Sequence, residues 1–278
     1  MRAVVLDAAG RPRLAEVDEP EGDVVRVLAC GLCGSDVEKL RPEHAGAVLG
    51  HEVVAETRDG LRVALVHHAP CGECERCRSG HETTCEAFRG PTIWPGGFAE
   101  RAAADGWVEL PAGIDEARAT AVEPLACVLR GAERVPRGRV LIVGHGFVGR
   151  LFAEVLRRRG DDVFALDARP ERAGREPDGP LDAAVLCAPG GADAIRTVRP
   201  GGGVLVFADA GALPAGPVYR NELTVIGSRS ATPAAMREAA ALLPELDLPE
   251  PTVLPLERFD EGLELHRSGA ALKVVFEP

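Results

Sequence analysis

Four cysteines within fifteen residues carry the strongest chemical signal in the sequence. Two, two and seven residues separate them, at Cys71, Cys74, Cys77 and Cys85. Repeated C-x-x-C steps let tight turns present several thiolates to one ion, and four thiolates form the closed tetrahedral site typical of structural zinc. The charged residues between the cysteines leave too little apolar surface for a core, so the metal must supply the folding energy of this lobe. Two disulfides are the alternative, which the short spacing and the absence of a secretory signal disfavour.

A second possible metal site lies upstream of the cysteine lobe. Cys33 falls in the turn Gly31–Asp36, and His51 is followed directly by Glu52. A thiolate, an imidazole and a carboxylate are ligands of the kind used by catalytic zinc, which keeps one coordination position open. A lone cysteine is usually a small buried hydrophobe. A lone histidine is usually a hydrogen-bonded residue of the surface or the core. Two such motifs upstream of a zinc lobe together indicate a catalytic centre.

A glycine-rich turn in the second half of the chain predicts a dinucleotide site. The run 140–143 reads as a buried parallel strand, and the glycines 144, 146 and 149 lead from it into a helix that lasts to about Arg159. Glycine lets the backbone approach a pyrophosphate, whose charge the helix N-terminus favours. The predicted cofactor residues are Gly144, Gly146, Phe147, Val148, Gly149, Asp167 and Arg169.

The preference between the two nicotinamide dinucleotides depends on Asp167. This carboxylate follows a second strand, 163–166, and stands 21 residues beyond Gly146, where it would accept hydrogen bonds from the ribose hydroxyls and repel a 2′-phosphate. The sequence therefore favours NAD. Arg169, two residues further on, keeps NADP open as an alternative.

The remaining periodic runs predict two domains, which 278 residues are long enough to form. Short β-branched runs at 3–7, 23–29 and 53–56 indicate a β-rich first domain, and the turn at 31–36 is expected to open a short helix capped by Ser35 or Asp36. A helix is expected over 115–135, interrupted so that Glu123 precedes its second part. Only 14 residues, rich in Pro and Gly, separate Asp167 from Asp182, so the second domain should hold about five parallel strands.

The composition argues against several classes of partner. A net charge of −11 and a pI near 5.2 argue against nucleic acid or an anionic membrane surface. The N-terminal stretch has no signal-peptide pattern, and no run reaches the length of a membrane span. Eight cysteines without a secretion signal suit a reducing compartment, so we expect a cytoplasmic protein. We expect its substrate to be a small molecule. Only Lys39 and Lys273 of the 32 basic residues are lysines, so an isolated arginine is weak evidence of anion recognition.

The motifs together resemble the zinc-containing medium-chain dehydrogenases. They occur in one order across essentially the whole chain, at 31–36, 50–52, 71–85, 123–125 and 144–149. The Glu-Pro-Leu at 123–125 and the Gly-Ser-Arg at 227–229 look more like the sorbitol, threonine and aminocyclitol dehydrogenases than the liver-type alcohol dehydrogenases. The resemblance implies an α/β fold. A catalytic domain with a GroES-like β-barrel core (1–122 and 249–278) would flank a trimmed Rossmann domain with a doubly wound parallel sheet (123–248).

The resemblance also implies roles for the residues of the first domain. Cys33 and His51 match two ligands of the catalytic zinc, and the third would be Glu52 or Glu123, with Glu123 slightly favoured and Glu52 exchanging. Together with the four-cysteine lobe this gives two zinc ions per chain. Ser35 matches the hydroxyl that contacts the zinc-bound alcohol, and Asp36 the carboxylate that orients the histidine.

Two departures from the family concern the proton path and the adenine pocket. Glu38 stands where the proton relay commonly ends on a histidine, and the second crossover of the Rossmann domain is cut down. The expected reaction is still hydride transfer between NAD and a polyol, sugar or amino alcohol, with Arg229 and Trp94 contacting the substrate. The alternatives are an NADPH-dependent reductase of the same fold and a zinc-stabilised NAD(H)-binding protein without turnover. A homodimer or homotetramer is expected. Cys30, Cys127 and Cys187 are expected to bind no metal, since none has a partner at metal spacing.

Overall fold

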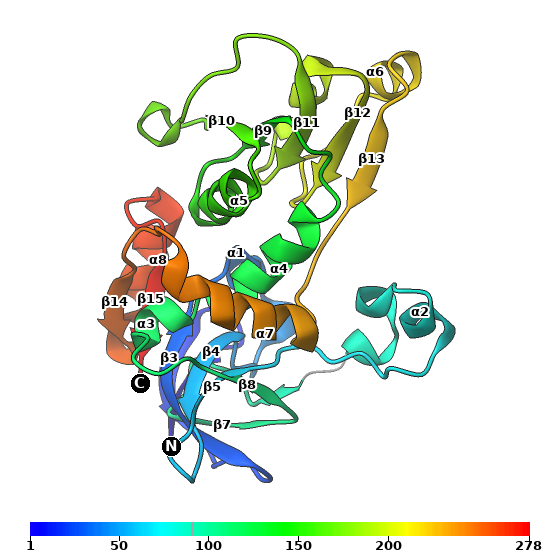
Figure 1. Cartoon of the computed structure of the whole chain (residues 1–278). Helices are drawn as coiled ribbons and strands as arrows, with labels where there is room; N and C mark the ends of the chain where they lie inside the picture. The colour runs from blue at the N-terminus through cyan, green and yellow to red at the C-terminus, as the bar shows by residue number, and fades with distance from the viewer. Residues whose placement is uncertain (90–91) are drawn as a thin grey trace. The chain divides into compact units, whose positions relative to one another are not determined.

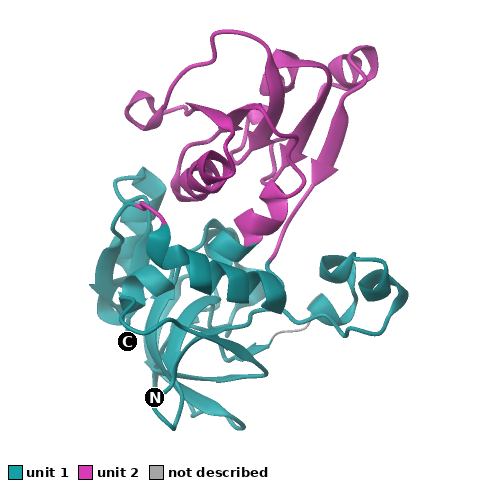
Figure 2. Cartoon of the chain, in the orientation of Figure 1, with its two compact units in different colours: residues 1–126, 231–245, 249–278 teal, residues 127–230, 246–248 magenta. Residues whose placement is uncertain are grey.

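The computed structural model describes residues 1–89 and 92–278 and divides into two compact units. Unit 1 comprises Met1–Ala126, Ala231–Glu245 and Pro249–Pro278, and unit 2 comprises Cys127–Ser230 and Leu246–Leu248 (Figure 2). Both ends of the chain therefore belong to unit 1, and a middle segment forms most of unit 2.

Unit 1 is built on an antiparallel sheet that gathers strands from both ends of the chain. Along its main path the strands lie in the order β14-β15-β3-β4-β5-β8, while β7 joins the side of β3 and pairs with β6. A separate hairpin pairs β1 with β2. The bounds are β1 Arg2–Leu6, β2 Pro12–Glu16, β3 Val24–Gly31, β4 Glu52–Glu56, β5 Arg62–Leu65, β6 Ile93–Trp94, β7 Arg101–Ala104, β8 Trp107–Glu109, β14 Thr252–Pro255 and β15 Val274–Glu277.

The core of unit 1 is filled by aliphatic and phenylalanine side chains from these strands. Phe98, Phe259 and Phe276 form an aromatic cluster, with ring centroids 4.5 to 5.6 Å apart. Buried valines on β3 and β4 pack in the same cluster as these rings. Phe276 comes from the last strand of the chain and Phe98 from the first half, so the core closes only when both chain ends are in place.

The helices of unit 1 are short. They are α1 Gly34–Glu38, α2 Glu75–Arg78, α3 Glu116–Ala119, α7 Pro233–Leu242 and α8 Phe259–Ser268, and α4 Val122–Ala132 runs from unit 1 into unit 2. Helix α7 packs against β8 with its buried Met236 and Ala240. None of the helices described in residues 1–89 and 92–278 is both long and apolar enough to cross a membrane.

Unit 2 is a five-stranded parallel sheet, as the sequence predicts. Figure 1 shows its strands side by side in the order β10-β9-β11-β12-β13. Their bounds are β9 Arg139–Val143, β10 Asp162–Leu166, β11 Leu181–Leu186, β12 Val198–Val206 and β13 Thr224–Gly227, and the helices are α5 Phe147–Arg158 and α6 Ala215–Arg220. Between β10 and β11 the structure has one 3-10 turn, η4 Pro170–Arg172, in place of a crossover helix. The trimmed Rossmann sheet is thus confirmed.

Three local expectations differ from the structure. Glu123 lies inside α4, because Pro124 is still within the first turn, where its missing N–H costs no hydrogen bond. Cys33 rather than Ser35 or Asp36 is the N-cap of α1, and Asp36 contributes from the third helical position. Helix α7 falls in unit 1, whereas the sequence places 123–248 in the cofactor domain, because its apolar face packs on β8.

Candidate metal and cofactor sites

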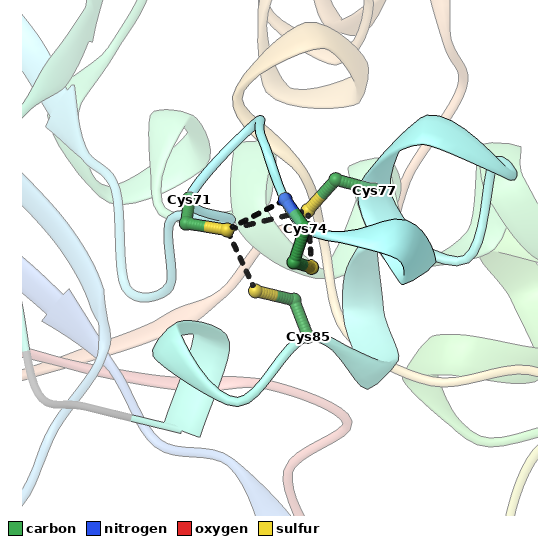
Figure 3. Close-up of side chains that lie close together, drawn as sticks. All are labelled: Cys71, Cys74, Cys77 and Cys85. Carbon is green, nitrogen blue, oxygen red and sulfur yellow. Dashed lines mark hydrogen bonds between the residues drawn. The ribbon is translucent and has the colours of Figure 1, made fainter.

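The cysteine lobe brings its four thiols to one point, as Figure 3 shows. The sulfur–sulfur distances are 3.5 Å for Cys74–Cys77, 3.5 Å for Cys71–Cys85 and 3.9 Å for Cys71–Cys77. A tetrahedron of thiolates at the usual zinc–sulfur distance has sulfurs about 3.8 Å apart, whereas a disulfide needs about 2.05 Å. All eight cysteines of the chain are free. The donor set and its spacing therefore fit zinc, and the disulfide alternative is not formed.

A second group of metal-binding side chains joins Cys33, His51 and Glu52. Their ligand atoms all lie within 4.8 Å of one another. Cys33 is the N-cap of α1 at the end of β3, while His51 directly precedes β4 and Glu52 begins it. Since β3 and β4 pair antiparallel with Gly31 opposite Glu52, the sheet register brings the cysteine turn beside the His-Glu pair. A sulfur, a nitrogen and an oxygen ligand form a three-residue set suited to a zinc with an open position.

Asp36 orients the histidine of this group. Its Oδ1 lies 3.2 Å from His51 Nδ1, which leaves Nε2 for a metal, and its Oδ2 accepts a hydrogen bond from the Cys33 N–H at 3.1 Å. Burial alone disfavours the imidazolium, but the adjacent Asp36 carboxylate and Cys33 thiol raise the pKa of His51 well above its ordinary value. One buried carboxylate therefore fixes the positions of two candidate ligands.

Glu52 forms an ion pair with a buried lysine, Lys273. Lys273 Nζ contacts Glu52 Oε2 and donates a hydrogen bond to the Leu32 carbonyl at 3.2 Å. The side chains of both partners of this ion pair are at most 5% exposed. A Cβ at Gly31 would lie 2.1 Å from the Glu52 carboxylate and 2.9 Å from Lys273 Nζ, so only glycine leaves room for the pair. Strand β15, which pairs with β3, delivers the lysine from the far end of the chain.

Two further histidines continue from the metal group. The His67 ring lies 4.7 Å from that of His51, and the His68 ring 3.8 Å from His67. Burial, with the nearby histidines, lowers the pKa of His67 to about 2, so its ring is neutral. The structure thus places a neutral imidazole beside the predicted zinc ligand His51.

The other predicted catalytic residues are near this group in the chain but differ in exposure. Ser35 is half-buried in α1, two residues after Cys33, and Glu38 is exposed at the end of the same helix. Glu123, the slightly favoured third ligand, is buried in the first turn of α4 and is not a member of the group. Glu52 is the carboxylate of the group, because it follows His51 directly at the start of β4.

The glycine-rich turn of unit 2 has the tight geometry that the sequence predicts. Gly144 has φ +93° and a Cβ there would lie 2.5 Å from the Ala188 Cβ, while a Cβ at Gly149 would lie 2.0 Å from the Gly144 carbonyl oxygen. Gly146 is the N-cap of the twelve-residue α5, whose first residues are Phe147 and Val148. Around Gly146 the nearest atom to a Cβ would be Arg172 Nη1, at 4.0 Å. This open, glycine-lined helix start fits a dinucleotide pyrophosphate.

Asp167 is fixed by two backbone hydrogen bonds at the end of β10. Its Oδ2 accepts from the His145 N–H at 2.7 Å, and its Oδ1 accepts from the Arg169 N–H at 2.9 Å. The carboxylate is half-buried, as is Arg169. Each carboxylate oxygen can accept further hydrogen bonds, so the residue remains suited to ribose hydroxyls.

The two predicted substrate residues lie outside both of these groups. Trp94 is 61% exposed and lines a surface hollow with Glu21, Asp23 and Asp105, so the structure does not bring it to the Cys33 group. Arg229 is exposed after β13 in unit 2. The residue that the sequence reasoning missed is Lys273. Its residue type could have indicated a role, because the chain has 30 arginines and only two lysines, and one of these lysines stands at position 273.

Comparison with known proteins agrees with this geometry. Residues 20–112 match the alcohol dehydrogenase GroES-like domain. The chain is 26% identical to the sorbitol dehydrogenase of Halalkalibacterium halodurans, over 100% of this chain and 99% of the relative. It is also 26% identical to the L-galactonate-5-dehydrogenase of Escherichia coli (strain K12), over 80% of each chain. The alignment with the sorbitol dehydrogenase spans 341 positions, more than the 278 residues here, so this chain lacks segments that the relative has.

A solved structure extends the similarity to the whole fold. The alcohol dehydrogenase from Thermus sp. ATN1 superposes with a TM-score of 0.84 at 27% identity, covering 100% of both chains. Residues 20–112 are thus similar to the alcohol dehydrogenase GroES-like domain, and the chain as a whole is similar in sequence and fold to the zinc-containing medium-chain alcohol dehydrogenases, sorbitol dehydrogenase among them.

Proposed function

We propose that the protein is a zinc-dependent oxidoreductase that transfers a hydride between a secondary alcohol and NAD. The observation that carries the proposal is the cluster of Cys33, His51 and Glu52 with Asp36 hydrogen-bonded to the histidine. A closed structural site has four protein ligands, whereas this set has three, as catalytic zinc sites have. The names of the relatives support a sugar or polyol substrate.

Two bound groups would supply the central chemistry. Zinc at this cluster would lower the pKa of a substrate hydroxyl, and a nicotinamide would accept the hydride from the alcohol carbon. The proposed zinc count is two per chain, one at the cluster and one in the cysteine lobe.

The protein's own residues orient the ligands and move the proton. Asp36 holds the His51 Nδ1 proton, so that the Nε2 lone pair faces the metal position. Ser35, two residues from Cys33, is proposed to take the hydroxyl proton of the substrate. Glu38 lies three residues further on, on the same side of α1, and is exposed, so it can pass the proton to water. Lys273 holds the Glu52 carboxylate in a buried ion pair.

The proposed cofactor is NAD, held by the turn Gly144–Gly149 with the ribose on Asp167. Asp167 is ordered by the His145 and Arg169 N–H groups, which supports a ribose-binding role and disfavours a 2′-phosphate. NADP remains the second candidate, because the half-buried Arg169 and the guanidinium of Arg172 near Gly146 both offer positive charge.

The proposed substrate is polyhydroxylated or amino-substituted, with Arg229 contributing to its binding. The exposed guanidinium of Arg229 follows the carboxyl end of β13, the edge at which parallel sheets bind ligands. Few aromatic residues, 4% of the chain, are available to build an apolar pocket.

A screen of sugars, polyols and amino alcohols with both cofactors, read as absorbance of the reduced nicotinamide, tests the proposal. We expect turnover of at least one polyol with NAD, and loss of turnover in His51→Ala. Arg229→Ala should raise KM with little change in kcat, the pattern of lost uniform binding. Absence of turnover with one zinc per chain would favour the NAD(H)-binding alternative, and turnover of simple aliphatic alcohols alone would refute the polyol assignment.

We also propose a homo-oligomer located in the cytoplasm. The eight free cysteines fit a reducing compartment. Sedimentation equilibrium of the zinc-loaded protein measures the oligomeric state, and a monomer at micromolar concentration would contradict it.

A further inference from the structure

The short connection between β10 and β11 in unit 2 has no helix that could hold its residues against the sheet. In place of a helix, the residues after β10 form η4 (Pro170–Arg172) and then return along the sheet edge. A helix would rest on the sheet through an apolar face, whereas a segment of this length buries little apolar surface. Yet the first half of this segment must hold Asp167 and the arginines beside the glycine-rich turn.

The second half of the segment is fastened to the sheet. The Ala165 N–H donates to the Arg175 carbonyl at 3.1 Å, and the Gly174 N–H donates to the Ala165 carbonyl at 3.0 Å. The Arg175 guanidinium stacks 4.1 Å over the Phe164 ring and forms an ion pair with Asp162. These contacts anchor residues 174–175 on β10 but do not reach the glycine-rich turn.

His145 links the first half of the segment to that turn. It stands between Gly144 and Gly146, its residue is 7% exposed, and its Nδ1 lies 2.7 Å from the Arg172 carbonyl oxygen. Since a carbonyl can only accept, Nδ1–H is the donor. The backbone N–H of the same residue donates to Asp167 Oδ2 at 2.7 Å. One residue of the turn thus holds both the start and the end of the segment Asp167–Arg172.

We propose that His145 is a positioning residue whose side chain fastens the Asp167–Arg172 segment to the phosphate-binding turn, replacing the missing helix as support for the cofactor's adenosine side. Burial, reinforced by the positive charges of Arg150 and Arg157, lowers the pKa of His145, so the ring stays neutral near pH 7. The bond therefore forms without adding charge to the turn. The inference rests on the proposed NAD-binding function, but the hydrogen bond between His145 and Arg172 is present in the protein without cofactor.

The variants His145→Asn and His145→Leu form a matched pair. The Asn amide nitrogen occupies about the position of the histidine Nδ1 and can donate to the Arg172 carbonyl, while leucine has the same size and no donor. The dissociation constant of NADH, from nicotinamide fluorescence, should rise about three- to tenfold for Leu, which is the usual worth of one hydrogen bond, and stay near wild type for Asn. KM for NAD should follow the dissociation constant, and kcat at saturating NAD should not change.

Hydrogen exchange of the cofactor-free protein provides a separate readout. Amides of residues 168, 169 and 171–173 should exchange faster in His145→Leu than in wild type or His145→Asn, while the Gly174 amide, which donates to the Ala165 carbonyl, stays protected. Equal exchange and equal NADH affinity in both variants would overturn the proposal. If the wild type bound neither reduced dinucleotide, the proposed function would fail. The exchange comparison would still test whether the His145 side chain holds the Asp167–Arg172 segment. Should His145→Leu not fold, His145→Gln, whose donor lies at the Nε2 position, replaces it in the comparison.

Discussion

The two candidate metal sites of unit 1 are built in opposite ways. The cysteine lobe takes all four ligands from residues 71–85, around a helix of four residues, and Cys71 at its edge is exposed. The Cys33 group takes its candidate ligands from the ends of two paired strands and supports them with a carboxylate from α1 and a lysine that directly precedes the last strand. The first is local and reaches the surface at Cys71, and the second is non-local and largely buried.

The two sites differ in whether the metal orders the protein segment or the protein fold orders the metal ligands. In the lobe, thiolates without an ion would face one another at 3.5 Å with little apolar support, so a bound zinc would hold the segment together. In the second group the β-sheet register and the buried pairs fix the ligands before any metal arrives. We therefore expect metal loss to unfold the lobe locally, but to leave the fold around Cys33 intact.

The largest effect is expected for Cys74→Ser. Binding of a structural zinc is worth about 10 kcal/mol or more in small domains, and loss of one of four thiolates should abolish tight binding at the lobe. Zinc content should fall from two to one per chain, and amides of residues 71–85 should lose protection from hydrogen exchange. Cys187→Ser, at a half-buried cysteine that follows β11 in unit 2, is the control and should keep two zinc ions. Retention of both ions in Cys74→Ser would contradict a four-thiolate site.

Cys33→Ala should remove catalysis while sparing the fold. The metal supplies several kcal/mol of transition-state stabilisation, so turnover should fall about 1,000-fold or more. The melting temperature should change little, because the cap of α1 uses the Cys33 main-chain N–H, which alanine keeps. Cys30→Ala is the matched control, a fully buried cysteine three residues earlier that should cost only about 1 kcal/mol of stability. If the two variants lost activity equally, the ligand assignment would be wrong.

Lys273→Met tests whether the second site is organised without metal. Removing one partner of a buried ion pair leaves the other charge uncompensated and typically costs about 3–5 kcal/mol. The free energy of unfolding, from denaturant titration, should fall by about that amount in zinc-free protein, and by less with zinc, since the ion can compensate Glu52. The double variant with Glu52→Gln should recover most of the loss. Equal losses with and without zinc, with no recovery, would show that the pair does not couple to the metal position.

Sequence reasoning reached what depends on local spacing. The lobe, the glycine-rich turn and the five-stranded sheet follow from runs of a few residues whose types dictate the geometry. The role of Lys273 depends on contacts across more than 200 residues of chain, and the choice between Glu52 and Glu123 depends on how β3 and β4 pair. Strand register of that range is set by the whole core, including Phe98 and Phe276, and no spacing in the sequence encodes it.

Asp36→Asn is expected to have the smallest effect of the four, and it separates orientation of a ligand from ligation itself. Asn keeps the size of the side chain and an acceptor for one of the N–H groups of Cys33 and Gly50, which now donate to the carboxylate at 3.1 and 3.4 Å. It loses the negative charge beside His51 Nδ1, so the imidazole becomes a poorer donor to the metal. Loss of such a partner typically lowers metal affinity 10- to 100-fold, about 1.4 to 2.7 kcal/mol. Competition with a chelator should show this loss at the second site alone, with the lobe of the same protein as the internal control. Unchanged affinity at both sites would mean that Asp36 serves only to order α1.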